Sequence, residues 1–316
     1  MPSRPTHRTP IAGRLQGRRG RGPHARGRRS PMVEGPALDN GACTADGRIL
    51  DDATPSAVSL PAPESPSQVP PTPRVASPVP WMLALSLAGW GALAWIAFDM
   101  GHPLAQLTMP ASSDWRWANV LAVAAMWAVM MAAMMLPSAL PMVLAFVKLS
   151  RRSAEAMRAR SFVAAYLLVW LAFSVAATGL QWALQAAGWV NPMIVSTSAL
   201  LSGVLLLVAG AYQFSPLKHI CLTHCRTPIG FLVGEWRAGA FGAFVMGVRH
   251  GLFCLGCCWA LMALLFVGGV MNLAWIAALS IVVAIEKLLP QGQRLASVLG
   301  LVLIAAGALR LWSLLG

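Results

Sequence analysis

Seven apolar runs, each close to the length of a membrane-spanning helix, dominate the chain after residue 80 and limit what it can fold into. About 20 consecutive apolar residues are needed to cross a bilayer as a helix, because each residue adds only about 1.5 Å. The runs cover residues 81–98, 118–147, 162–186, 194–214, 240–267, 270–286 and 295–315. They predict an all-α, polytopic domain over residues 80–316, with about seven transmembrane helices in a lipid bilayer. Pro137 and Pro141 lie inside the second run and predict a kink or break there.

Residues 1–79 have the opposite character and predict a disordered tail. They are rich in Pro, Arg, Ser and Gly and contain no Phe, Trp or Tyr, so they cannot bury enough surface to offset the entropy of ordering. The tail carries 11 Arg and 6 acidic residues, and residues 80–316 carry 13 Lys or Arg and 5 acidic residues. Most Lys and Arg of residues 80–316 lie between the apolar runs. We therefore interpret the formal charge of +13 as a determinant of how the chain is oriented in the membrane. Nucleic-acid binding is the weaker explanation.

The distribution of Lys and Arg among the loops predicts the topology. Five lie in residues 148–160, three in residues 215–239 and two in residues 287–294, whereas the alternate loops contain only Arg116. Loops that are rich in Lys and Arg lie on the cytoplasmic side of the membrane. We therefore expect a multi-pass protein of the bacterial inner membrane, with a cytoplasmic N-terminus and an external C-terminus.

The densest chemical motif is R-H-G-L-F-C-L-G-C-C-W-A-L-M, from Arg249 to Met262, within the fifth apolar run. Its potential ligands fall at positions i, i+4, i+7 and i+8, so they share one side of a helix. They are His250, Cys254, Cys257 and Cys258. A histidine beside cysteines within an apolar run indicates function rather than packing. We interpret this stripe as half of a site for a thiophilic metal.

A second group of similar ligands follows the fourth apolar run, in K-H-I-C-L-T-H-C from Lys218 to Cys225. It supplies His219, Cys221, His224 and Cys225. The predicted topology places this group on the membrane side where the fifth run begins. The two groups can therefore meet near one face of the membrane, and thiolate with imidazole suits Cu(I) or Zn(II).

Methionines of the second apolar run favour copper over zinc. Met126, Met130 and Met134 form one thioether stripe in M-W-A-V-M-M-A-A-M-M-L-P, and thioethers are soft ligands that suit Cu(I). Packing is the simpler explanation for methionines considered alone, because they fill apolar helices readily. The Glu286-Lys287 pair at the end of the sixth run has two explanations, an interfacial pair that reaches toward water or a carboxylate that supports the site.

These motifs resemble a bacterial family described as predicted metal-binding integral membrane proteins, sometimes labelled copper chaperones. The resemblance is carried by M-W-x-x-M-M-x-A-M-M-x-P at Met126–Pro137, Y-Q-x-S-x-x-K-x-x-C-L-x-x-C at Tyr212–Cys225, and R-H-G-x-x-C-x-G-C-C-W-x-L-M at Arg249–Met262. It covers roughly residues 80–315 and leaves out the tail. It implies a membrane protein that binds metal, and it supplies no reaction.

Three functions fit these observations. The leading one is Cu(I) handling by a protein that is not an enzyme, with a copper chaperone or a copper enzyme as its partner. The second is a thiol–disulfide oxidoreductase that uses Cys254-x-x-Cys257, although the predicted external loops lack cysteine and the cytosol is reducing. The third is a structural Zn(II) site in a membrane protein with another role.

Overall fold

The computed structural model describes residues 78–112, 114–150 and 155–314, and within these ranges the chain is all-α, as predicted. The helices are α1 (Val79–Phe98), α2 (Pro103–Thr108), α3 (Trp117–Leu149), α4 (Glu155–Ala186), α5 (Ala199–Tyr212), α6 (Pro216–Arg226), α7 (Pro228–Glu235), α8 (Gly239–Ala263), α9 (Leu265–Gly268), α10 (Leu273–Leu288) and α11 (Gly292–Trp312). The tail predicted to be disordered lies outside the described residues, apart from its last two positions.

Five stretches of the described chain, rather than seven, are long and apolar enough to cross a membrane, or six if one bent pair counts as a span. The five are α1, α3, α4, α8 together with α9, and α11. The bent pair is α5 and α6, which meet at 64°. The fourth and sixth apolar runs form helices of only 14 and 16 residues. At about 1.5 Å per residue each of these is by itself shorter than the hydrocarbon core. By length and composition the described helices thus give five or six candidate spans, where about seven were expected.

Helix α3 continues through both of its prolines. Pro137 and Pro141 lie within one 33-residue helix, so of the expected kink or break, the break does not occur in this described segment. A helix of this length spans about 50 Å and extends well beyond the hydrocarbon core.

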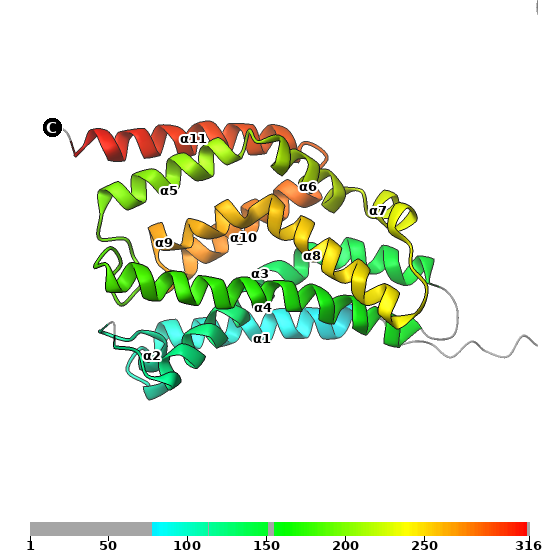
Figure 1. The fold of residues 1–316 in the computed structure, drawn as a ribbon, viewed down its shortest axis with the longest axis horizontal. Coiled ribbons are helices and arrows are strands. Elements are labelled where there is room, and N and C mark those ends of the chain that lie inside the picture. Colours follow the sequence, from blue (N-terminus) through cyan, green and yellow to red (C-terminus); the bar gives the residue numbers. More distant parts are fainter. Residues whose placement is uncertain (1–77, 113, 151–154, 315–316) are drawn as a thin grey trace, which may run out of the picture. The chain divides into compact units, whose positions relative to one another are not determined.

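Helix α8 lies at the centre of the described helices. In Figure 1, α8 and α10 lie between the α5–α11 pair and the helices α1, α3 and α4. Gly247 and Gly251 bring α8 close to α4, since a Cβ atom on Gly251 would lie 2.9 Å from the Cβ atom of Val169. The motif that carries most of the candidate ligands is therefore on the most enclosed membrane-length helix.

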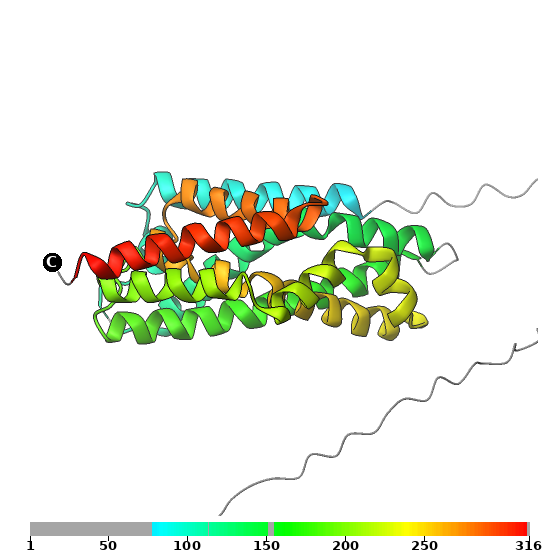
Figure 2. The ribbon, with the colours of Figure 1, turned by 90° about the horizontal axis from the view of Figure 1, so that it is seen from above.

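Small residues also hold α5 against α11. The two helices run side by side in both views (Figures 1 and 2). A Cβ atom on Gly307 would lie 2.9 Å from the carbonyl oxygen of Gly203. Close backbone approach at small residues is the usual way in which helices pack in membranes. It fixes α5, which leads into α6, against α11.

Candidate metal centre

The potential ligands of α8 all face the protein interior. His250, Cys254, Cys257 and Cys258 are each at most 3% exposed. The thiols of Cys257 and Cys258 donate to the Cys254 carbonyl oxygen, at 3.1 and 3.0 Å. Helical spacing alone accounts for this shared face.

Helix α6 brings the second cysteine group to the first. Its start is stabilised by Ser215, whose hydroxyl accepts a hydrogen bond from the Leu217 amide at 3.2 Å, and by Pro216 in the first turn. The buried Cys221 side chain lies over Gly256 of α8, where an added Cβ atom would come within 2.6 Å of its sulfur. The half-buried Cys225 packs against the apolar core that contains Cys254, Cys257 and Cys258. Cys221 and Cys225 of α6 thus lie at the contact of α6 with the cysteine-bearing part of α8.

Lys287 of α10 points into this cluster. Its Nζ atom lies 3.0 Å from Cys254 Sγ, 3.3 Å from Ser138 Oγ and 3.6 Å from Met135 Sδ. Tyr166 of α4 lies on the same sulfur, with its hydroxyl 3.2 Å from Cys254 Sγ and 3.2 Å from the Met135 carbonyl oxygen. Cys254 therefore has a cation and a hydroxyl as direct neighbours. We name Cys221, Cys225, Cys254, Cys257 and Cys258 the sulfur cluster.

Glu286 is buried and paired, so the interpretation of Glu286-Lys287 as an interfacial pair reaching toward water was wrong. Glu286 and Lys287 are 1% and 6% exposed. The Glu286 carboxylate accepts a hydrogen bond from Lys218 of α6 at 2.7 Å, and both side chains are 2% exposed. The pair ties α6 to α10, which positions Cys221 and Cys225 on one side and Lys287 on the other. Glu286 thus supports the sulfur cluster without touching it.

The three candidate histidines lie in different surroundings. His250 is buried, with its ring stacked on Tyr166 and Phe162 at centroid distances of 5.6 and 5.9 Å. His224 is half-buried and stacks on Phe253 at 4.2 Å, while its Nδ1 atom contacts the Ile220 carbonyl oxygen at 2.9 Å. His219 is half-buried one turn earlier on α6. Aromatic packing therefore orients two of the three rings.

The predicted thioether stripe is buried on α3. Met126, Met130 and Met134 are at most 4% exposed and belong to the same apolar core as the cysteines of α8. The sulfur that reaches the Lys287 amine belongs to Met135, the residue after the stripe. The stripe thus lines the core beside the sulfur cluster.

The described side chains contain soft donors without a formed coordination shell. Among them, no group of three or more His, Cys, Asp or Glu side chains is arranged to hold a metal ion. The donor set of thiols, imidazole and thioethers still fits Cu(I) better than a hard cation. The described thiols do not converge on one point, and the Lys287 amine lies against Cys254.

Two contributors were missed by inspection of the sequence, Tyr166 and Ser138. Tyr166 is one of only two tyrosines in the chain and lies inside an otherwise apolar run, which was the available signal. Ser138 follows Pro137 and gave no such signal.

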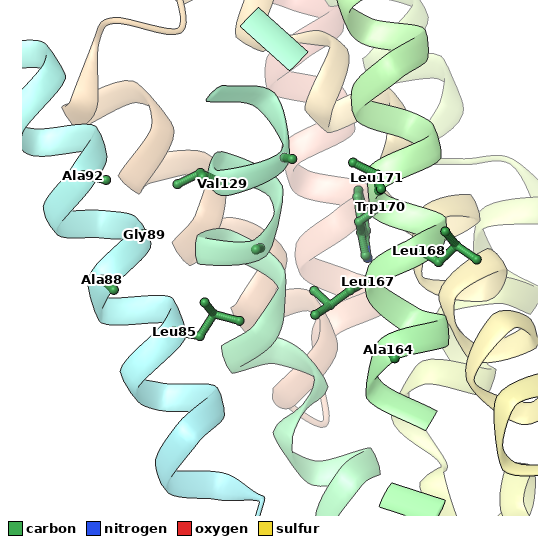
Figure 3. Close-up of a pocket in the computed structure, with 12 residues that line it drawn as sticks. Leu85, Ala88, Gly89, Ala92, Val129, Ala164, Leu167, Leu168, Trp170 and Leu171 are labelled. Atoms are coloured by element: carbon green, nitrogen blue, oxygen red, sulfur yellow. The ribbon is translucent and has the colours of Figure 1, made fainter. Parts of the chain in front are cut away.

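A groove between α1, α3 and α4 is not part of this centre. Its volume is about 630 Å³, and its lining is Ala, Gly, Leu, Val and Trp170 (Figure 3). Such a lining offers no soft ligand. The groove, as lined by these described residues, therefore provides no candidate site for a soft metal ion.

Comparison with known proteins agrees with the motifs. A family model described as PpoB2, copper chaperone, matches residues 124–310. This is more than half of the chain and includes every candidate ligand named above. Neither the curated proteins nor the solved structures contain a match.

Proposed function

The chain belongs to the PpoB2 copper chaperone family, and from this premise we propose that it binds Cu(I) within the membrane and passes it to a protein partner. The observation that carries the proposal is that Cys221 and Cys225 of α6 pack against the part of α8 that bears Cys254, Cys257 and Cys258. Two to three thiolates are a strong and selective set for Cu(I), and His250 or His224 can complete it. His219, which is half-buried on α6, is the third candidate imidazole ligand.

The arrangement favours transfer over permanent storage. Several similar ligands allow copper to move by exchange, one sulfur at a time, whereas a closed four-ligand cage retains its metal. Met126, Met130 and Met134 extend the soft ligands along α3. The partner would be a copper enzyme or a second copper chaperone. The chain itself would lie in the bacterial inner membrane with its N-terminus in the cytoplasm.

Metal stoichiometry tests the proposal. Purified protein in lipid nanodiscs should hold about one or two Cu(I) per chain, and the Cys254→Ser/Cys257→Ser variant should lose it, because these are the central donors. Cys43→Ser is the matched control, since Cys43 lies far from the motifs in sequence. X-ray absorption on the same samples reports the metal and its number of sulfur neighbours. Retention of all copper by the double variant would refute the assignment, and zinc without copper would support a structural Zn(II) site.

A thiol–disulfide oxidoreductase is the second candidate, and one observation favours it. Cys225 packs against the core that contains Cys254 and Cys257, so a disulfide could shuttle between α6 and α8. Thiol trapping in cells separates the two functions. A Cys225–Cys254 or Cys254–Cys257 disulfide that cycles in metal-free protein would favour the oxidoreductase.

A further inference from the structure

A polar hollow lies beside the sulfur cluster, between the C-terminal ends of α6 and α10. Its volume is about 500 Å³. The lining residues are Thr223, Arg226, Thr227, Lys287, Leu288, Pro290 and Gln293. Most of them are exposed or half-buried, so the hollow opens at the surface.

Lys287 joins this hollow to the sulfur cluster. The residue lines the hollow, and its Nζ atom is 3.0 Å from Cys254 Sγ. The residue is only 6% exposed. Lys287 therefore borders the hollow and contacts Cys254 as well.

The charge of the hollow is positive. Arg226 and Lys287 are its two cations, and none of the described residues that line it is Asp or Glu. The nearest carboxylate along the chain, Glu286, is paired with Lys218. The Thr223 and Thr227 hydroxyls both donate to carbonyl oxygens of α6, at 2.8 Å. A free monovalent copper cation would be repelled here, and an anion would be attracted.

We propose that the hollow admits Cu(I) as an anionic complex with two small thiolates. This rests on the proposed copper function and names the form in which the copper arrives. Two Cu–S bonds to the small thiolates break, and two Cu–S bonds to cysteines of the sulfur cluster form. The two protons of the cysteine thiols leave on the departing thiolates. Copper stays at +1, and the net charge of −1 moves from the complex to the protein, next to the Lys287 ammonium.

Charge changes at Gln293 test the proposal without altering any cysteine. Gln293 is half-buried at the wall, and Gln293→Lys and Gln293→Glu shift the charge of the hollow in opposite directions. With Cu(I)–glutathione as donor, Gln293→Lys should raise the initial loading rate about threefold and Gln293→Glu should lower it about as much. Both effects should shrink as salt rises to about 0.5 M. With cationic Cu(I)–acetonitrile, the two effects should reverse sign.

The control is Gln106→Lys, which adds the same charge to the exposed face of α2. Rates that change in the same direction with both donors, or an equal acceleration by Gln106→Lys, would overturn the proposal. Copper content at saturation separates this failure from failure of the proposed function. Wild-type protein that binds no copper from either donor, or whose copper survives Cys254→Ser/Cys257→Ser, refutes the copper site itself.

Discussion

The Lys287 Nζ atom lies 3.0 Å from the Cys254 Sγ atom, so α10 places a buried cation against a cysteine of α8 that belongs to the sulfur cluster. A Cu(I) ion held by two thiolates carries a net negative charge, and a charge of this kind inside a membrane protein needs a partner of opposite sign. Lys287 is placed to be that partner once it has moved off Cys254.

Replacing this cation should weaken copper binding. We expect Lys287→Gln to lower the Cu(I) affinity about tenfold, because the negative centre would lose its nearest positive charge in a medium of low dielectric constant. Competition titration against a chromophoric Cu(I) chelator measures the change. Lys148→Gln, at an exposed position of α3, is the control and should leave the affinity unchanged. Equal affinities for the Lys287 and Lys148 variants would contradict the assigned role.

Gly256 should be required for the approach of Cys221 to α8. An added Cβ atom would lie 2.6 Å from the Cys221 sulfur, so Gly256→Ala should destabilise the fold by about 1–3 kcal/mol through overpacking. Thermal unfolding in detergent provides the measurement. Gly234→Ala is the control, since its Cβ atom would meet no atom within 4 Å.

The same contact can be tested by rescue. Cys221→Ala removes the sulfur and leaves the Cys221 Cβ position 3.5 Å away, an ordinary contact distance. Adding Cys221→Ala to Gly256→Ala should therefore restore most of the lost stability, a coupling that a double-mutant cycle reports. Additive effects of the two substitutions would show that the sulfur does not lie over Gly256.

The Lys218–Glu286 pair should be sensitive to loss of one partner. Glu286→Gln leaves a buried ammonium without its counter-ion, and we expect a loss of about 3–5 kcal/mol in unfolding free energy. The Lys218→Met/Glu286→Leu variant should recover much of this, since no buried charge is left unpaired. Glu235→Gln breaks the exposed pair with Arg249 and should change stability by about 1 kcal/mol or less. A Glu286→Gln variant as stable as Glu235→Gln would refute the buried pair.

The thioether stripe should affect copper movement more than folding. Leucine has nearly the volume of methionine, so Met126→Leu, Met130→Leu and Met134→Leu should each cost less than about 1.5 kcal/mol. Combined, they should slow copper release to an acceptor several-fold, because leucine offers no soft donor. Stopped-flow transfer to a chelator is the measurement. Met142→Leu, at a buried position of α3 in a separate apolar core, is the control. If transfer is unchanged in the triple variant, the stripe is packing alone.

Local periodicity was sufficient to predict the helical class and the shared face of His250, Cys254, Cys257 and Cys258. Both depend on the spacing of residues within one helix, which the order of amino acids specifies directly. Helix bounds were less predictable, since α5 covers only residues 199–212 of the run 194–214, and α10 is shifted to 273–288 relative to the run 270–286. Residues near the helix ends contribute to this, because Ser198 and Asn272 cap the starts of α5 and α10.

The contacts between helices were decided by the fold. Lys287 and Cys254 are 33 positions apart, and Lys218 and Glu286 are 68 apart. No spacing rule links such residues, because their meeting depends on how α6, α8 and α10 cross. The sequence showed Glu286-Lys287 as two adjacent charges at a helix end. In the fold, the Glu286 side chain contacts Lys218 of α6 and the Lys287 side chain contacts Cys254 of α8. The two can do so because adjacent residues on a helix point about 100° apart.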